Sequence, residues 1–124
     1  MIFVGLDLCE VSRFEHILKK YPSRISRIFT EEEIEHAEGR KNWRAATFAA
    51  CWAAREAAVK ALGCGFSDGI SFCDISVSFD EAGAPHLVMT GEAEKKAREL
   101  SAVEWSVSLT HERGMAAAVV VGRK

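Results

Sequence analysis

The spacing of apolar residues predicts strands near both ends of the chain and within its second half. In residues 2–9 every second position is aliphatic, and Asp7 falls on the opposite face of the predicted strand. Further stretches with this two-residue period are separated by segments rich in turn-forming residues. The strands predicted in this way are residues 2–9, 75–79, 86–89, 105–110 and 115–121, with turns at 80–85 and 111–114.

A different pattern lies in the middle of the chain. Residues 44–62 contain neither glycine nor proline and are rich in alanine, the best helix former, so they predict one long helix. Gly63 and Gly65 follow directly and end it. Strands around a long helix, mostly paired antiparallel, predict an α+β fold with an antiparallel sheet packed on that helix.

Three shorter helices are expected. Thr30 and Glu33 have the spacing of a capping box, in which each side chain bonds the backbone N–H of the other, and this accounts for Glu33. The helices are predicted at residues 12–20, 31–39 and 90–100, the last with Thr90 as its cap.

Composition narrows the class of protein. The chain has 124 residues, of which 48% are hydrophobic and 27% charged, which is typical of one globular domain, here residues 1–124. The formal net charge is only −2, so no overall field selects nucleic acid or a membrane as a partner. The first residues lack a basic lead, and no apolar run is long enough to span a bilayer, so we expect a cytoplasmic protein.

The cysteines and most histidines suggest no chemistry by their spacing. Cys9, Cys51, Cys64 and Cys73 lack the pairing of a zinc site and are expected to be reduced and mostly buried. His16, His36 and His86 show no spacing with a partner and are expected at the surface.

The first candidate for chemistry is the pair of Glu56 and Lys60 on the long helix. Four positions apart, they lie on one face, and as a surface ion pair they would stabilise the helix by about 0.3–0.5 kcal/mol. The alanines around them leave room for something bulky above this face. In addition, backbone N–H groups at Gly63 and Gly65 could approach an anion, although the two glycines are equally explained as a helix cap.

The second candidate is Asp7, a carboxylate inside an otherwise aliphatic strand. It would be costly to bury without a partner. Arg13 or backbone N–H groups could satisfy it. Alternatively, Asp7 and Glu56 converge on one divalent cation, since Mg²⁺ typically takes one or two carboxylates together with water and substrate phosphate oxygens.

These residues belong to a set of motifs that resembles the small 4′-phosphopantetheinyl transferases, the holo-[acyl-carrier-protein] synthases. The motifs occur in the family's order along the whole chain. They are Gly5-Leu6-Asp7-Leu8 with Glu10-Val11-Ser12-Arg13, Phe29-Thr30-x-x-Glu33, Trp52-Ala53-Ala54-Arg55-Glu56-Ala57-x-x-Lys60-Ala61-Leu62-Gly63-x-Gly65, Gly83-x-Pro85, and Ser106-Val107-Ser108-Leu109-Thr110-His111.

The resemblance implies Mg²⁺-dependent transfer of 4′-phosphopantetheine from coenzyme A to a serine of apo acyl carrier protein, a step of fatty acid biosynthesis that releases adenosine 3′,5′-bisphosphate. It implies that Asp7 and Glu56 hold the Mg²⁺ and that Lys60 reaches a phosphate, so these three are the expected catalytic residues. The expected coenzyme A contacts are Arg44, Arg55, Lys60, Gly63, Gly65, Pro85, Ser108 and His111.

The resemblance also has implications for partners. Arg13 is expected to dock the acidic carrier protein, and a basic stretch that follows it, with Lys19, Lys20 and Arg24, can act with it or simply be a solvated face. Small members of the family are trimers with active sites between subunits, so we expect a homotrimer, with the strands from 105 to 121 as its interface. Two alternatives stay open: the same chemistry on a polyketide or peptide-synthase carrier, or a non-catalytic subunit that holds coenzyme A.

The chain departs from the family pattern at three positions. Cys51 stands where many members have an arginine, Arg55 where they usually have lysine, and Cys64 where they have threonine. The first change removes an expected phosphate contact, and Arg44 or Arg55 is the predicted substitute.

Overall fold

The architecture is seen in a computed structural model, which describes residues 1–124 with the exception of the Ser67 side chain. Five strands and five α-helices are joined in part by short 3₁₀ turns. In chain order the elements are β1 Ile2–Glu10, α1 Val11–Lys20, η1 Pro22–Arg24, α2 Ile25–Ile28, α3 Glu31–Glu38, η2 Lys41–Trp43, α4 Arg44–Ala61, η3 Phe66–Asp68, η4 Phe72–Asp74, β2 Ile75–Phe79, β3 Pro85–Met89, α5 Gly91–Glu99, β4 Glu104–Glu112 and β5 Met115–Arg123.

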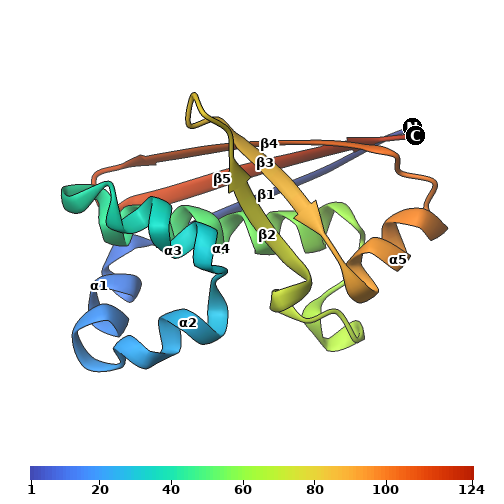
Figure 1. Ribbon diagram of the computed structural model, residues 1–124. Coiled ribbons are helices and arrows are strands. Elements are labelled where there is room, and N and C mark those ends of the chain that lie inside the picture. Colours follow the sequence, from blue (N-terminus) through green and yellow to red (C-terminus); the bar gives the residue numbers. More distant parts are fainter.

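A three-stranded antiparallel sheet, in the order β1-β5-β4, lies along the long helix α4, and the hairpin of β2 and β3 forms a second, smaller sheet (Figure 1). Helices α1, α2 and α3 gather at one end of α4, and α5 lies near the other end, where both chain termini meet. The predicted α+β fold, with an antiparallel sheet packed on a long central helix, is confirmed.

The alanines of α4 bring the sheet close. Ala53, Ala54, Ala57 and Ala58 are fully buried. Gly5 of β1 lies so near that a Cβ atom added to it would be 1.8 Å from the carbonyl oxygen of Ala57. The expectation that these alanines leave space for a ligand is therefore wrong: the sheet occupies that space, because small side chains on both elements allow close packing.

The two faces of β1 differ as the alternation predicts. The inward face carries Asp7 toward α4, whereas the aliphatic side chains face outward and are 62–72% exposed. These outward side chains are Ile2, Val4, Leu6 and Leu8. On the neighbouring strand β5, Val121 continues the apolar face, but outward positions of β4 hold serine, threonine and glutamate. The exposed apolar surface thus centres on β1 and β5 rather than on the whole hairpin.

Most element boundaries agree with prediction, and two local details differ. The capping box of Thr30 and Glu33 is present as predicted. Thr90 occupies the cap position of α5, but its hydroxyl donates to the carbonyl of Asp74 and caps nothing. In the last hairpin, β4 runs on to Glu112, so the turn is shorter than predicted.

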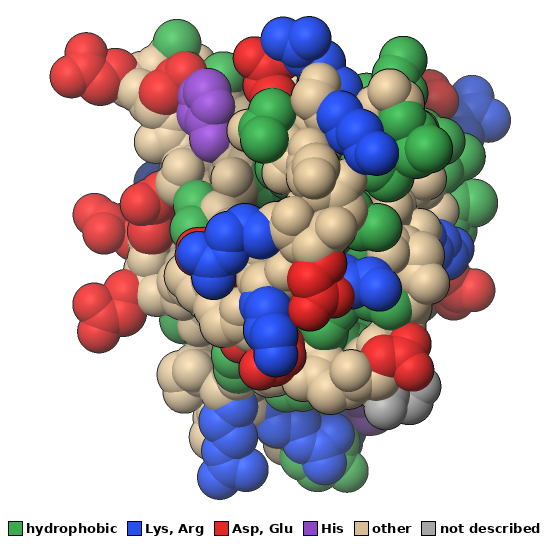
Figure 2. All heavy atoms as spheres, turned by 90° about the vertical axis from the view of Figure 1, so that its right-hand side faces the viewer, with side chains coloured by type: hydrophobic (Ala, Val, Ile, Leu, Met, Phe, Trp, Pro, Cys, Tyr) green, Lys and Arg blue, Asp and Glu red, His purple; other side chains and the backbone are tan. Residues whose placement is uncertain are grey.

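The cysteines and the surface complete the description. Each of the four described cysteines is free; Cys9 and Cys51 are buried, Cys64 is half-buried and Cys73 is exposed. On the face of the molecule near α5, acidic side chains line one margin, and basic side chains with a few acidic ones among them occupy the centre (Figure 2). Among the helices of the described chain, none combines the length and hydrophobicity needed to cross a membrane.

Candidate active site

The structure brings Asp7, Glu56 and Lys60 together between β1 and the last turns of α4. The Lys60 ammonium donates to the Asp7 carboxylate over 2.9 Å and to the carbonyl oxygen of Leu6 over 3.1 Å. Glu56 lies one turn before Lys60 on the same face of α4. Gly5, two residues before Asp7, permits the close approach that lets these side chains meet.

Burial and the neighbouring charges both act on the pKa of Glu56. Burial, followed by the nearby Asp7 carboxylate, raises the pKa of Glu56, and the positive charges of Lys60 and Arg13 lower it by less. Within the described side chains, the Glu56 carboxylate makes no hydrogen bond and the ammonium of Lys60 turns to Asp7 instead. The positive charges nearby therefore do not fully offset the two carboxylates of Asp7 and Glu56 when both are ionised. This favours the binding of a further cation beside them.

The donor set fits a Mg²⁺ ion that is shared with a ligand. No group of three or more described histidine, cysteine or acidic side chains could by itself hold a metal ion. Two carboxylates, Asp7 and Glu56, are nevertheless what Mg²⁺ commonly takes from a protein when water and phosphate oxygens supply the remaining ligands.

Arg13 is oriented toward this cluster. Its guanidinium lies over the Trp52 ring, 5.4 Å from the ring centre, and Trp52 precedes Glu56 by one turn of α4. Its charge lowers the pKa of Glu56. Arg13 thus borders the acid pair instead of pointing freely away from it.

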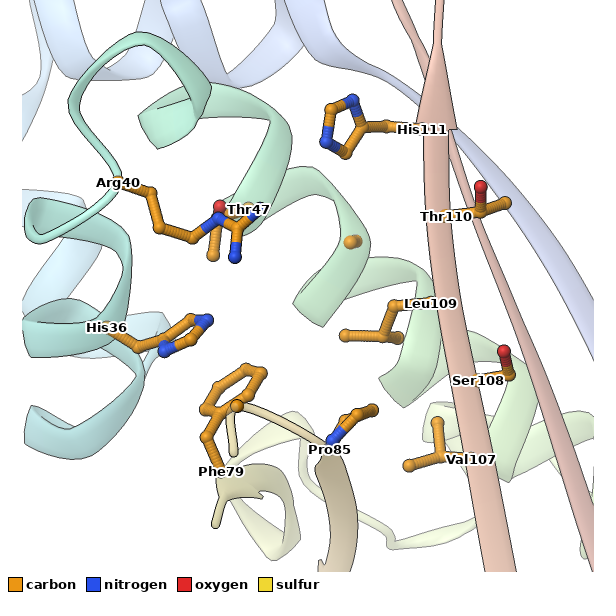
Figure 3. A pocket seen from close by; sticks show the side chains of 12 residues that line it. His36, Arg40, Thr47, Phe79, Pro85, Val107, Ser108, Leu109, Thr110 and His111 are labelled. Carbon is orange, nitrogen blue, oxygen red and sulfur yellow. The ribbon is translucent and has the colours of Figure 1, made fainter. Parts of the chain in front are cut away.

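A separate cavity of about 370 Å³ contains three of the predicted coenzyme A residues (Figure 3). Pro85 and His111 line it from β3 and β4, whereas the side chain of Ser108 turns away because alternate residues of β4 face outward. Phe79 and His36 are stacked at its wall, with ring centres 3.6 Å apart and planes within 6°.

The cavity also contains residues that sequence reasoning missed. Arg40 and Thr47 line it together with the stacked His36 and Phe79. The expectation that His36 is a plain surface residue is wrong, because it is half-buried against Phe79, and burial lowers its pKa. Only the pairing of α3 with β2 brings these residues together, and no local motif signals it.

The acid cluster and the cavity lie on different sides of α4. Thr47 and Glu56 are nine positions apart on the helix, which places them about 13 Å apart along the axis and roughly half a turn around it. Across the sheet, Asp7 pairs with Ala118, which pairs with Leu109 at the cavity wall. Asp7 and Leu109 therefore lie on opposite edge strands, roughly 10 Å apart.

Arg55 does not face a ligand, and its predicted coenzyme A contact is contradicted. The guanidinium is 1% exposed and forms a bidentate pair with Glu33, with both contacts at 2.7 Å. The remaining donors bond the carbonyl oxygens of Ile28, Cys51 and Phe72, so that all five N–H groups are used.

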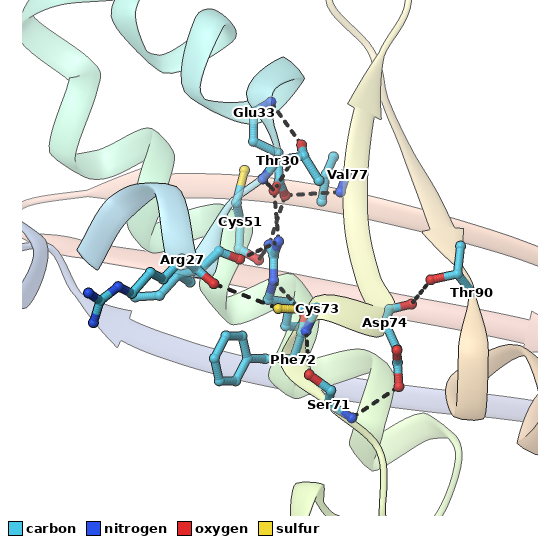
Figure 4. A network of polar contacts seen from close by, with 12 residues as sticks. Arg27, Thr30, Glu33, Cys51, Ser71, Phe72, Cys73, Asp74, Val77 and Thr90 are labelled. Carbon is cyan, nitrogen blue, oxygen red and sulfur yellow. Dashed lines mark hydrogen bonds and ion pairs between the residues drawn. The ribbon is translucent and has the colours of Figure 1, made fainter. Parts of the chain in front are cut away.

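Glu33 therefore has a second role besides capping. It accepts from the backbone N–H of Thr30 and of Val77 while it pairs with Arg55 (Figure 4). The network ties α3, α4 and β2 together. The prediction that Glu33 only caps a helix is therefore incomplete.

The glycine turn after α4 is a helix cap. Gly63 has a φ of 73°, which suits glycine, and its N–H donates to the carbonyl of Lys60. The N–H of Gly65 donates to the Asp68 carboxylate over 2.8 Å. Both N–H groups predicted to approach an anion are thus already used within the chain, which contradicts that contact.

The remaining predicted residues lie on the surface. Arg44 donates to Glu38 over 2.7 Å and borders a different cleft from Pro85. Lys19, Lys20 and Arg24 are exposed around the end of α1, and Arg24 lies over the Tyr21 ring at 4.0 Å. Their docking role stays a prediction.

Comparison with known proteins shows the family. A family model described as the 4′-phosphopantetheinyl transferase superfamily matches residues 3–120. The holo-[acyl-carrier-protein] synthase of Streptomyces avermitilis is 39% identical over 98% of this chain and 96% of its own. The chain belongs to the 4′-phosphopantetheinyl transferase superfamily.

Solved structures show the same fold. The crystal structure of the holo-[acyl-carrier-protein] synthase from Neisseria meningitidis matches with a TM-score of 0.83 at 28% identity and covers 100% of both chains. The Helicobacter pylori synthase in complex with coenzyme A matches with a TM-score of 0.81 at 28% identity, over 97% of this chain and 99% of that one.

Proposed function

We propose that this chain, acting as one domain over residues 1–124, transfers 4′-phosphopantetheine from coenzyme A to a serine of apo acyl carrier protein, with Mg²⁺, for fatty acid biosynthesis. The observation that carries the proposal is the meeting of Asp7, Glu56 and Lys60 in a member of a superfamily of such transferases. A relative of the same fold binds coenzyme A.

Each residue of the cluster has a role in this reaction. The serine oxygen forms a bond to the phosphorus that carries the pantetheine arm, the bond from that phosphorus to the leaving phosphate breaks, and adenosine 3′,5′-bisphosphate departs. Asp7 and Glu56 would hold a Mg²⁺ ion, which supplies positive charge to the phosphoryl oxygens. Lys60 stabilises negative charge on the same diphosphate. Glu56, or a water molecule beside it, takes the serine proton.

The separation of acid cluster and cavity supports a site shared between subunits. In one copy, a coenzyme A molecule with its diphosphate at Asp7 and its nucleotide beside His111 would have to cross α4. A second copy removes this obstacle if its β4 edge meets the β1 edge of the first. Head-to-tail contacts of this kind close into a ring when the rotation between neighbouring copies returns to the first copy, and we propose the homotrimer that the family resemblance implies.

The exposed aliphatic face of β1 and β5 supports the same arrangement. Side chains such as Val4 and Leu6 are more than 60% exposed next to the acid cluster. An apolar surface of this kind is typical of a protein interface. The interface we propose is therefore centred on β1 and β5, with β4 of the neighbouring copy at its margin.

Carrier docking and localisation are further parts of the proposal. Arg13, Lys19, Lys20 and Arg24 offer positive charge on α1 and the turn that follows it, and Arg13 borders the acid cluster, which suits an acidic carrier protein. The free cysteines agree with a reducing compartment, and we place the reaction in the cytoplasm.

Transfer is tested directly by incubating the protein with apo carrier protein, coenzyme A and Mg²⁺ and weighing the carrier by mass spectrometry. A mass gain of one phosphopantetheine group, abolished by EDTA, is expected. A gain only on carrier domains of polyketide or peptide synthases would reassign the acceptor. No gain on any carrier, with coenzyme A still bound, would show a non-catalytic subunit.

Mixing two inactive variants tests the shared site. Glu56→Gln removes the acid half and His111→Ala the nucleotide half, so each variant alone should be nearly inactive. Because half of the copies contribute an intact acid half and the other half an intact nucleotide half, refolded mixtures should recover about a quarter of wild-type activity. No recovery, or an active particle of 13.6 kDa, would contradict the trimer with shared sites.

A further inference from the structure

A tight turn between β2 and β3 borders the cavity that contains Pro85 and His111. It spans residues 80–84, between Phe79 and Pro85, whose side chains both lie in the cavity wall (Figure 3). Gly83, within the turn, also lines the cavity. The conformation of the turn therefore decides the shape of this part of the wall.

Hydrogen bonds, and not the packing of side chains, hold this turn. Residues 80–84 are all exposed, and the two alanines and the glycine among them are too small to reach the rest of the molecule. Gly83 has a φ of 85°, a left-handed conformation that suits glycine. An exposed segment of this kind samples many conformations unless specific bonds restrict it.

The Asp80 carboxylate supplies three of these bonds. One oxygen accepts from the backbone N–H groups of Ala82 and Ala84, over 3.0 and 2.9 Å. The other oxygen lies 3.1 Å from Nε2 of His86. The backbone adds two bonds, from the Asp80 N–H to the Ala84 carbonyl over 3.0 Å and from the Gly83 N–H to the Asp80 carbonyl over 2.8 Å. One side chain thus joins the two arms of the hairpin across the turn.

Asp80 acts on the cavity through the turn and not by contact with a ligand. It is not among the described residues that line the cavity. The bond from His86, followed by the bond from the Ala84 backbone, lowers the pKa of Asp80, so the carboxylate is ionised near pH 7. An ionised carboxylate repels the phosphates of a nucleotide and does not bind them.

We propose that Asp80 is a positioning residue for coenzyme A, because it holds the 80–84 turn in the conformation in which Gly83 and Pro85 face the nucleotide. A turn that is ordered before the ligand arrives avoids the entropy cost of ordering it on binding. This inference rests on the proposed transfer reaction, which supplies coenzyme A as the ligand.

The test compares Asp80→Ala with Asp80→Asn in the transfer reaction. Loss of the three side-chain bonds should raise the KM for coenzyme A roughly 3- to 10-fold. The kcat and the KM for the carrier protein should change little, because Asp80 touches none of the reacting groups. Asp80→Asn should recover most of the affinity, since its amide oxygen can still accept from the N–H groups of Ala82 and Ala84. Because the turn is exposed, both variants should keep the fold in thermal melts.

Glu81→Ala is the matched control, since it removes the same charge from the next residue of the same turn. It should not raise the KM for coenzyme A. Hydrogen exchange of the backbone amides gives a readout without turnover. In Asp80→Ala the N–H groups of Ala82 and Ala84 should exchange faster than in the wild type, and adenosine 3′,5′-bisphosphate should slow them again.

Three outcomes overturn the inference while transfer itself stands. They are an Asp80→Ala variant with the wild-type KM for coenzyme A, an Asp80→Asn variant that loses as much affinity as Asp80→Ala, and a Glu81→Ala variant whose KM rises equally. Failure of the proposed function looks different, since the wild type would then modify no carrier, whereas the exchange of the turn is measured without transfer.

Discussion

Arg55 and Glu56 are neighbours on α4, yet their environments are opposite. The Arg55 guanidinium is 1% exposed and every one of its N–H groups has an acceptor. The Glu56 carboxylate is half-buried next to a second acid, Asp7, and its pKa is raised by burial and by that neighbour. One helix thus carries a buried charge with complete hydrogen bonding and, at the next position, a half-buried charge beside a second acid.

The difference between Arg55 and Glu56 distinguishes a residue that stabilises the fold from one that is available for function. A buried ion pair with complete hydrogen bonding needs nothing further and fixes the packing of α3, α4 and β2. A pair of acids that lacks sufficient positive charge is stable only near water or a cation, and such groups are enriched at functional sites. Substitutions can test separately whether the buried pair of Arg55 and Glu33 stabilises the fold and whether the acid pair of Asp7 and Glu56 is needed for activity.

The largest effect on stability should come from Glu33→Gln. This change leaves the buried Arg55 without a counter-charge, and removal of one partner of a buried pair costs about 3–5 kcal/mol. Urea unfolding measures the loss in the free energy of unfolding. The control is Glu94→Gln, which breaks the exposed pair with Arg98 and should cost less than about 0.5 kcal/mol. A loss below about 1 kcal/mol for Glu33→Gln would contradict the structural role.

Asp7→Asn and Glu56→Gln test the functional role of the acid pair. Each should lower kcat/KM for carrier modification by about 10²–10³-fold, because charge that develops on the phosphoryl oxygens loses its stabilisation. The free energy of unfolding should not fall for Glu56→Gln. Glu10→Gln, an exposed acid on the same strand, is the control. Full activity in either site variant would remove that residue from the mechanism.

A substitution that moves β1 away from α4 should lower both stability and activity. In Gly5→Ala the new methyl group would overlap the Ala57 carbonyl, so β1 must move away from α4, at a cost of about 1–3 kcal/mol. The same shift moves Asp7 from Glu56 and should lower activity. Gly39→Ala, where the nearest atoms lie at 3.6 Å and φ is −71°, should be tolerated. Equal stability of both variants in thermal melts would contradict the tight packing.

The smallest effect is a pH dependence of stability that belongs to Glu56. Its pKa in the folded state lies above the value of 4.5 that an unperturbed glutamate has, so the folded protein binds the proton more tightly than the unfolded chain. The contribution favours the fold at low pH and is lost as the pH rises past 4.5 to the folded pKa. Relative to Glu56→Gln, the wild type should become less stable over that range. The opposite slope in urea titrations would contradict the raised pKa.

Local patterns predicted most of the elements. The two-residue period predicted that Asp7 lies on the face of β1 opposite the aliphatic side chains, although not which face packs on α4, and the spacing of Thr30 and Glu33 predicted the capping box. The convergence of Asp7 and Glu56 was one of two interpretations that the residue types left open, and only the motifs of a family favoured it. The bond between Asp7 and Lys60 was not predicted, because no local signal relates positions 53 apart.

The errors have one physical cause. Alanine is small, and a run of alanines can make room for a ligand or for another element of the fold. The sequence does not distinguish these cases, and here the space is filled by β1. The sequence likewise does not show that Arg55 is buried against Glu33, or that Arg40 lines the cavity, because distant elements of the fold bring these residues together.

The proposed transfer reaction depends on Asp7 and Glu56 binding one divalent ion together. Mn²⁺ titration in the presence of coenzyme A, followed by electron paramagnetic resonance, measures this without turnover. The wild type is expected to bind one Mn²⁺ per chain, and Asp7→Asn and Glu56→Gln should each weaken binding at least about tenfold, as the loss of a charged ligand implies. Unchanged affinity in both variants, with coenzyme A still bound, would show that these two carboxylates do not hold the ion.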